Sequence, residues 1–313
     1  DYLVAELDEY QNKLKYFNPQ AVLLNNIEYD HPDFFPSKTD YKQAFIEFIK
    51  KIPKRGFLVA NYDDPCVRKI AQVNCRGKVI TYAINESADF TAYNIKQHNN
   101  QQYFKVKMAG ENDQEAKLKD MELGDFSINL LGKHNLSNAL AVIAFCVEFN
   151  IDLWKIRQYL GEFKGAARRM QVLGEFKGAV IIDDYAHHPT EISASLAAAR
   201  ETYQNNKIIT VFHPHTYSRT KSLLEDFAKS FVDSDEIIIL DIYGSARENQ
   251  GGVHSNDLVK KIKSNNYMPD SNIHYIPTLK ACEQYLRKNT AKNDIVILMG
   301  AGNVFEIGEN LIK

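Results

Sequence analysis

The sequence has 313 residues, of which 44% are hydrophobic and 25% charged, a balance typical of globular proteins. The formal net charge of -2 argues against a nucleic-acid-binding protein, because such proteins carry a basic surface. No apolar run reaches the ~18 residues of a membrane-spanning helix, so membrane insertion is not expected. A chain of this length predicts about two domains.

The four cysteines are far apart in the sequence and form no C-x-x-C pair. A disulfide framework or a zinc site is therefore not expected, and a reducing, cytoplasmic location is predicted. Cys146 and Cys282 lie within apolar helical patterns and are predicted to be buried thiols.

The first half of the chain alternates short apolar segments with helical ones, the pattern of a parallel sheet covered by helices. Strands are predicted over 2–6, 21–26, 56–61 and 78–83. Apolar residues recur at helical spacing over 39–52, and another helix is predicted to begin near Asn135. Residues 90–130 break this rhythm. Alternation over 103–107, followed by a polar stretch over 110–120, predicts an antiparallel insert or edge.

The second half repeats the alternation and predicts a second, doubly wound α/β unit. Strands are predicted over 179–186, 207–214, 236–242, 273–277 and 294–300. Helices are predicted near 190–203, 218–231, 255–265 and 279–289. Residues 161–167 are a plausible linker, which divides the chain into domains 1–166 and 167–313. In such folds ligands bind beyond the carboxyl ends of the strands.

Two polar clusters of the first half are candidate sites. Asn25–His31 directly follows a predicted strand, and Glu6 ends another. Carboxylates and an imidazole at strand ends suit a divalent cation, although a polar surface turn would look the same. In Gly132–Asn138, Asn135 and Asn138 share a helix face, and their amides suit an adenine edge. Alternatively, Asn135 is the N-cap of its helix.

The second half contributes a denser cluster at a strand end. Asp183–Thr190 holds two acids, a tyrosine and two histidines, and Pro189 suits the first turn of a helix. Packing alone does not explain so many titratable groups, so a functional role is favoured. The arginine pair Arg168-Arg169 precedes it, and arginine suits phosphate.

His213–Thr220 occupies the equivalent place after the next strand, where Arg219 at a helix start would meet an anion. Gly300–Asn303 joins a strand to a helix through small residues but lacks the third glycine of G-x-G-x-x-G. A nucleotide-dependent oxidoreductase is therefore poorly supported. No G-x-x-x-x-G-K-[ST] phosphate loop occurs in the chain.

In order, these motifs resemble the Mur ligase family of ATP-dependent amide-forming enzymes. They read N-N-I-E-x-D-H, G-x-H-N-x-x-N-A, x-R-R-x-x-x-x-G, D-D-Y-A-H-H-P-T-E, P-H-x-Y-S-R-T and G-A-G-N. The resemblance implies an incomplete central ATPase domain followed by a Rossmann-like C-terminal domain. Because the sequence starts inside a predicted strand, without a methionine or leader, we expect a fragment that lacks the phosphate loop and is itself inactive.

The resemblance also assigns roles to residues. It implies that His187 and Arg219 are catalytic and face the amino acid. It implies that Glu6 and His31 bind Mg²⁺. The implied ATP-binding residues are His134, Asn135, Asn138, Arg169 and Asp184. Thr216 stands where the family often has a second arginine, so the anion clamp there is expected to be thinner.

Within the family, the motifs look like those of the branch that joins L-alanine to UDP-N-acetylmuramate. The implied reaction passes through an acyl phosphate, and His187 would orient or deprotonate alanine. A recycling ligase that attaches a tripeptide and a non-catalytic nucleotide-binding regulator are the alternatives. The sequence predicts no oligomeric state.

Overall fold

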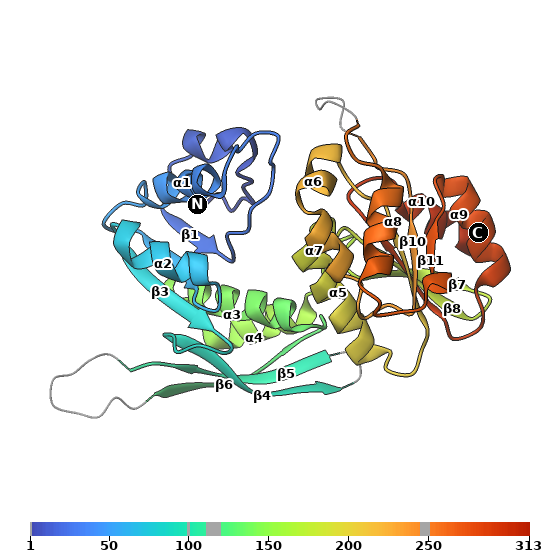
Figure 1. The fold of residues 1–313 in the computed structure, drawn as a ribbon. Coiled ribbons are helices and arrows are strands. Elements are labelled where there is room, and N and C mark those ends of the chain that lie inside the picture. Colours follow the sequence, from blue (N-terminus) through green and yellow to red (C-terminus); the bar gives the residue numbers. More distant parts are fainter. Residues whose placement is uncertain (1, 99–100, 111–119, 245–250) are drawn as a thin grey trace. The chain divides into compact units, whose positions relative to one another are not determined.

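The computed structural model describes residues 2–98, 101–110, 120–244 and 251–313. The chain separates into two compact units, Asp1–Lys164 and Gly165–Lys313. Each unit is built around its own six-stranded sheet (Figure 1). The chain is therefore an α/β protein with two sheets, as predicted.

The sheet of the first unit has the order β1-β2-β3-β4-β5-β6 and changes from parallel to antiparallel at β4. Its strands are β1 (Ala21–Leu24), β2 (Phe57–Asn61), β3 (Lys78–Ala83), β4 (Phe90–His98), β5 (Gln101–Met108) and β6 (Met121–Ile128). The predicted antiparallel insert is thus confirmed. Most of the predicted polar stretch over 110–120 lies outside the described residues.

Helices cover both faces of this sheet. They are α1 (Lys38–Ile49), α2 (Pro65–Asn74), α3 (Lys133–Glu148) and α4 (Leu153–Glu162), with a 3-10 helix η1 (Tyr10–Tyr16). Successive residues of β2 point to opposite faces: Phe57 and Val59 pack with α3, whereas Leu58 and Ala60 pack with α1 and α2. An unbroken apolar run is the expected sequence of a strand that is buried on both sides.

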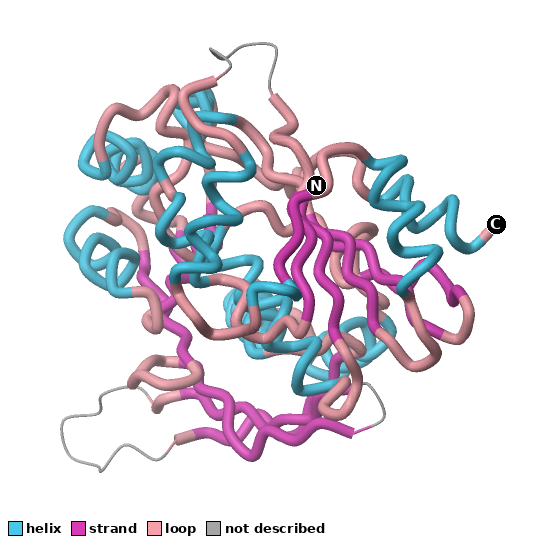
Figure 2. The backbone as a smooth tube through the Cα atoms, turned by 45° about the vertical axis from the view of Figure 1, so that its right-hand side comes forward, coloured by secondary structure: helices cyan, strands magenta, loops and turns pink. Residues whose placement is uncertain are grey.

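The sheet of the second unit has the order β11-β10-β9-β12-β8-β7 and is parallel except for its β7 edge. Its strands are β7 (Gln171–Phe176), β8 (Ala179–Asp184), β9 (Ile208–Phe212), β10 (Glu236–Ile239), β11 (Ile273–Tyr275) and β12 (Ile295–Met299). Figure 2 shows these strands side by side beside the helices near the C-terminus. The parallel strands align their carboxyl ends at one edge of the sheet.

Two separate hydrophobic cores make the second unit doubly wound. Its helices are α5 (Pro189–Thr202), α6 (Tyr217–Ser222), α7 (Leu224–Lys229), α8 (Ser255–Ser264), α9 (Leu279–Asn289) and α10 (Phe305–Ile312), with η2 (Asp270–Asn272). One core packs the sheet against α5, α7 and α8, and the other packs it against α9 and α10. Cys282 is buried in the second core as predicted, whereas Cys146 is only partly buried.

Two predicted elements are wrong. Residues 2–6 form no strand, and Tyr2 is 78% exposed. Among the described strands β1 is an edge strand that pairs only with β2, and residues 2–6 do not join its free edge. Their side chains are exposed, so no buried face fixes a strand there. The predicted helix 218–231 is two helices, α6 and α7, separated at Leu223 by a non-helical backbone. The elements α2, α4 and β7 were not predicted.

The helices formed by the described residues include none long and apolar enough to cross a bilayer.

Glycine is required where the parallel strands of the first unit begin. A Cβ added at Gly56 would lie 2.1 Å from the carbonyl oxygen of Gln20, and one at Gly77 would lie 2.2 Å from that of Gly56. The same two carbonyls accept hydrogen bonds from Phe57 and Lys78, which begin β2 and β3. A larger residue at either glycine must therefore displace backbone atoms, because the nearest atom is a carbonyl oxygen and not the end of a flexible side chain.

We predict that Gly56→Ala lowers the free energy of unfolding by about 1–3 kcal/mol, the usual cost of overpacking. Urea unfolding of the chain measures the change. Gly161→Ala is the matched control, because its added Cβ meets only Ser127 Oγ, at 3.6 Å. Because glycine is unfavourable inside a helix, Gly161→Ala in α4 should instead raise the free energy of unfolding by about 0.5 kcal/mol. A Gly56→Ala chain as stable as its parent would contradict the prediction.

Candidate functional site

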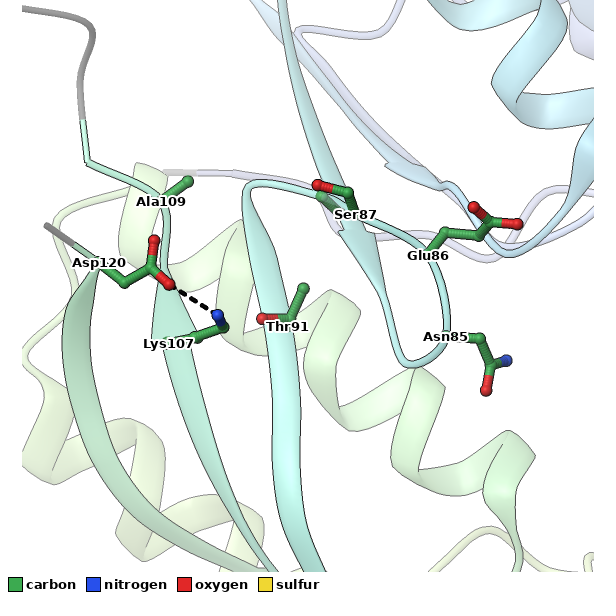
Figure 3. Close-up of a pocket in the computed structure, with 8 residues that line it drawn as sticks. Asn85, Glu86, Ser87, Thr91, Lys107, Ala109 and Asp120 are labelled. Carbon is green, nitrogen blue, oxygen red and sulfur yellow. Dashed lines mark hydrogen bonds and ion pairs between the residues drawn. The ribbon is translucent and has the colours of Figure 1, made fainter. Parts of the chain in front are cut away.

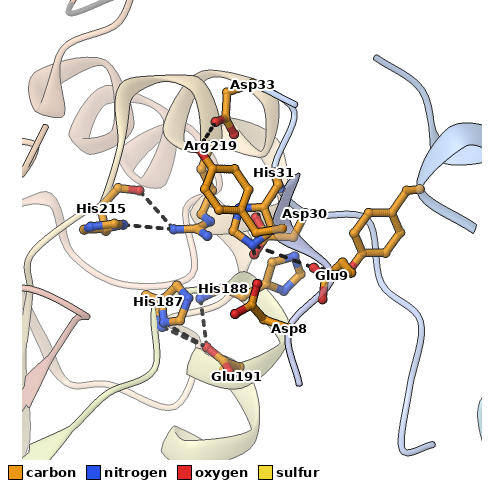
Figure 4. Close-up of polar contacts among 12 residues, drawn as sticks. Asp8, Glu9, Asp30, His31, Asp33, His187, His188, Glu191, His215 and Arg219 are labelled. Carbon is orange, nitrogen blue, oxygen red and sulfur yellow. Dashed lines mark hydrogen bonds and ion pairs between the residues drawn. The ribbon is translucent and has the colours of Figure 1, made fainter. Parts of the chain in front are cut away.

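The first candidate cluster surrounds His31 in the first unit. His31 follows β1 in a left-handed conformation (φ 55°). Its backbone N–H donates to Asp30 Oδ1 over 2.7 Å. Its Nε2 lies 3.7 Å from Glu9 Oε1 and 3.8 Å from Asp30 Oδ2 (Figure 4). The ring of Tyr10 packs against the imidazole, with centroids 4.5 Å apart. Two carboxylates thus flank His31.

Glu9, and not the predicted Glu6, is the carboxylate that the structure brings beside His31. Glu6 is exposed and makes no ion pair with His31 in the described part of the chain. Tyr41 donates to Glu9 over 2.8 Å and holds it in place. Burial and the neighbouring Glu9 raise the pKa of Tyr41, which keeps its hydroxyl a donor. The sequence signal for Glu9 was its place just after Glu6.

The described residues contain no group of three or more histidine, cysteine or acidic side chains arranged to hold a metal ion. Carboxylate and imidazole remain suitable ligands for a divalent cation. The metal roles of Glu6 and His31 therefore stay predictions.

The second cluster lies at the start of α3. Its N-cap is Gly132 (φ 88°), so the alternative that Asn135 caps the helix is wrong. Asn135 is in the first turn; its side chain donates to Leu131 O over 2.8 Å and lies 3.0 Å from His134 Nε2. Asn138 is exposed one turn further on. The three predicted adenine-binding residues are thus together, beside helix amides that no N-cap side chain covers.

A pocket of about 400 Å³ lies beside the antiparallel strands of this unit (Figure 3). Its lining is Asn85, Glu86, Ser87, Ala88, Thr91, Lys107, Ala109 and Asp120. Lys107 and Asp120 pair with each other over 2.6 Å. Asn85 accepts a hydrogen bond from Lys133, the first residue of α3. The pocket contains none of the predicted site residues, and its Lys107 already has an anionic partner.

In the second unit, Asp184 ends β8 and is almost completely buried. Its carboxylate accepts hydrogen bonds from Met170 N and Ala186 N, each over 2.8 Å, and from Ser195 Oγ over 3.3 Å. Burial raises the pKa of Asp184 in spite of these bonds. The geometry gives Asp184 a structural role, and its contact with ribose stays a prediction.

Arg168 has a structural role that the sequence did not distinguish from that of Arg169. Its Nε donates to Asp183 Oδ2 over 3.0 Å, and one terminal nitrogen donates to the carbonyls of Gly300 and Gly302 over 2.8 and 3.0 Å. One guanidinium therefore ties the end of β8 to the G-A-G-N loop.

Arg169 differs from its neighbour in exposure. Its side chain is 48% exposed, 3.7 Å from Glu191 Oε1, with the guanidinium over the Tyr185 ring. A fixed charge in this position is accessible to an anion, which agrees with the predicted phosphate contact. The contact of Arg169 with phosphate stays a prediction.

His187 is held at the start of α5 by a capping arrangement. Its Nδ1 lies 2.9 Å from Tyr185 O. The same nitrogen lies 3.4 Å from Glu191 Oε2 (Figure 4). Glu191 also accepts hydrogen bonds from the backbone N–H groups of His187 and His188. Burial alone would raise the pKa of Glu191, but His187 and Arg169 hold it below its usual value. A carbonyl only accepts, so Nδ1 carries the proton in neutral His187 and Nε2 is the basic nitrogen.

Arg219 lies in α6 and is only 4% exposed. Its guanidinium contacts His215, 3.2 Å from Nδ1 and 3.3 Å from the carbonyl oxygen. The His215 ring is 6.3 Å from that of His187. The clusters that follow β8 and β9 therefore meet at the carboxyl edge of the sheet, and the two predicted catalytic residues belong to one group of side chains.

His213, at the end of β9, is a buried histidine behind this group. It is 7% exposed, and its Nδ1 has no hydrogen-bond partner among the described residues. Burial lowers the pKa of His213 to about 4, although Asp241 acts in the opposite direction. The imidazole is therefore neutral in the folded protein near pH 7.

We predict that protonation of His213 destabilises the protein in acid. Between pH 6.5 and pH 4 the unfolded chain binds a proton that the folded chain does not, so stability falls as pH falls. The contribution amounts to about 3 kcal/mol at most. His213→Gln cannot titrate, so its stability should fall less over this range. Urea unfolding at several pH values measures both chains, and parallel pH profiles would contradict the prediction.

Two family models match the chain. The Mur ligase middle domain matches residues 1–146, and the Mur ligase glutamate ligase domain matches residues 168–302. A UDP-N-acetylmuramate--L-alanine ligase of Caldanaerobacter subterraneus subsp. tengcongensis is 38% identical over 313 residues, which are 100% of this chain and 65% of that protein. The chain thus spans less than two thirds of this relative's length.

Solved structures show the same fold. The UDP-N-acetylmuramate-alanine ligase MurC from Thermotoga maritima has a TM-score of 0.70 and 23% identity, covering 95% of this chain and 60% of that one. The MurF ligase from the same organism, in complex with ADP, has a TM-score of 0.64 and 17% identity, covering 95% and 62%.

Proposed function

Because the chain belongs to the Mur ligase family, we propose that the protein containing it joins L-alanine to UDP-N-acetylmuramate at the expense of ATP, in peptidoglycan precursor synthesis. The observation that carries the proposal is the group His187, His215 and Arg219 at the carboxyl ends of β8 and β9. The name of the relative at 38% identity supports L-alanine as the amino acid.

The amino-acid end of the reaction needs a cation and a base. A substrate amino acid brings a carboxylate, for which the fixed charge and planar donors of Arg219 are suited. Its ammonium group must lose a proton before nitrogen can attack an acyl phosphate. His187 presents Nε2 as its basic nitrogen because Nδ1 is held by Tyr185 O. We assign Arg219 to binding the carboxylate and His187 to orienting or deprotonating the amine.

The roles at the nucleotide end follow the family resemblance residue by residue. His134, Asn135 and Asn138 would bind adenine, Arg169 would bind phosphate, and Asp184 would act near the ribose, mainly by holding Met170 in place. When bound, Mg²⁺ would neutralise phosphate charge. His31 would hold it with a carboxylate, either the predicted Glu6 or the adjacent Glu9.

A cytoplasmic location is part of the same proposal. The reaction consumes ATP, and the four cysteines are free thiols.

We predict that the full-length protein releases phosphate from ATP only when Mg²⁺, UDP-N-acetylmuramate and L-alanine are all present. The recycled tripeptide, offered with the matching UDP-free muramate derivative, should give no release. Release with the tripeptide alone would move the protein to the recycling branch. If neither L-alanine nor the tripeptide causes phosphate release, ligase activity is refuted. The non-catalytic nucleotide-binding regulator would then be the remaining alternative.

The same assay tests the base. His187→Ala should slow L-alanine-dependent release by about 10²–10⁴-fold, the usual contribution of general acid–base catalysis. His98→Ala is the matched control, since His98 is exposed at the end of β4 and should leave turnover unchanged. Near-normal turnover of His187→Ala would remove that residue from the mechanism.

A further inference from the structure

Tyr243 is a residue of the second unit that no motif singled out. It follows β10 and forms a parallel bridge with His215. Its N–H donates to Pro214 O over 2.8 Å, and its carbonyl accepts from Thr216 N over 3.0 Å. The backbone of Tyr243 therefore spans the segment that leads into α6.

The ring of Tyr243 lies between the two histidines of the H-P-H sequence. Its centroid is 5.8 Å from that of His215, with nearly parallel planes (18°), and 5.4 Å from that of His213, edge to face (83°). A Cβ added at Gly302 would come within 3.3 Å of the tyrosine ring. Glycine at this position thus leaves room for the ring. Tyr243 is 45% exposed, so core packing alone does not explain it.

These contacts fix a strained residue just before Arg219. Thr216 has φ 69° and ψ 139°, a backbone conformation that residues other than glycine rarely adopt. Such backbone persists only where the surrounding structure holds it. Tyr243 holds the N–H of Thr216, and the carbonyl of Thr216 accepts from the side chain of Thr220 in α6.

The imidazole of His215 transmits the same constraint to Arg219. Arginine is always a donor, so His215 Nδ1 must be the acceptor in their 3.2 Å contact. This contact requires a fixed orientation of the His215 ring. The stacked face of Tyr243 supplies that orientation.

We infer that Tyr243 is a positioning residue that holds His215 and thereby aims Arg219 at the carboxylate of the amino-acid substrate. The assignment of that substrate rests on the proposed function. The placement of Arg219 by Tyr243 does not depend on it.

The test compares three variants of the full-length protein. Tyr243→Phe keeps the ring, whereas Tyr243→Leu and Tyr243→Ala remove its aromatic face. With L-alanine varied, the Leu and Ala variants should raise the KM for alanine about tenfold, while the KM for ATP stays unchanged. Tyr243→Phe should behave like the parent. Tyr159→Ala, at an exposed tyrosine of α4, is the control.

A second measurement separates this inference from the proposed function. NMR of the Arg219 Nε–H and the His215 imidazole should show shifts in the Leu and Ala variants but not in Tyr243→Phe. Unchanged signals in Tyr243→Leu would overturn the inference, as would a KM for alanine equal to that of the parent. A parent without alanine-dependent turnover would overturn the proposed function, and NMR would still decide how Arg219 is placed.

Discussion

Two buried carboxylates at the end of one strand organise the second unit. Asp183 and Asp184 close β8 at the carboxyl edge of the sheet, where burial raises the pKa of both. A buried charge is costly unless it is paired and hydrogen-bonded. Arg168 supplies the pairing for Asp183, and backbone N–H groups supply the bonds for Asp184. The loops that carry these partners must therefore assume one arrangement.

The candidate site follows from that arrangement through direct contacts. Arg168 holds the carbonyls of Gly300 and Gly302, and a Cβ added at Gly300 would come within 2.7 Å of His213 O. His213 contacts Tyr243, which stacks on His215. His215 in turn contacts Arg219. Residues that follow or end β8, β9, β10 and β12 are thus linked by a continuous series of contacts. The polar side chains that could contact a substrate belong to this series.

Sequence patterns predicted the strands and helix starts that depend on the chemistry of neighbouring residues in the sequence. Apolar runs such as 208–212 marked strands buried on both faces, and Pro189 marked the first turn of α5. The order of the motifs identified the Mur ligase family, which the family models confirm.

The remaining features depend on tertiary structure. The chain turns at Arg168 with φ 60°, which directs that arginine inward and leaves Arg169 accessible. Nothing in an Arg-Arg pair indicates which one turns. Likewise, only the fold shows that Glu9 lies beside His31, or that residues 2–6 stay outside the sheet. Long-range pairing decides these points, and local propensity does not.

Amide hydrogen exchange in an Arg168→Lys variant tests the organising role of the buried carboxylates most directly. Lysine keeps the charge but lacks the planar fork that reaches Asp183 and two carbonyls together. Our account predicts faster exchange at the amides of Met170, Ala186 and Gly300, which all donate to Asp184, with unchanged exchange in β9. Unchanged exchange at those three amides would show that the strand ends hold their arrangement without Arg168, and would contradict the account.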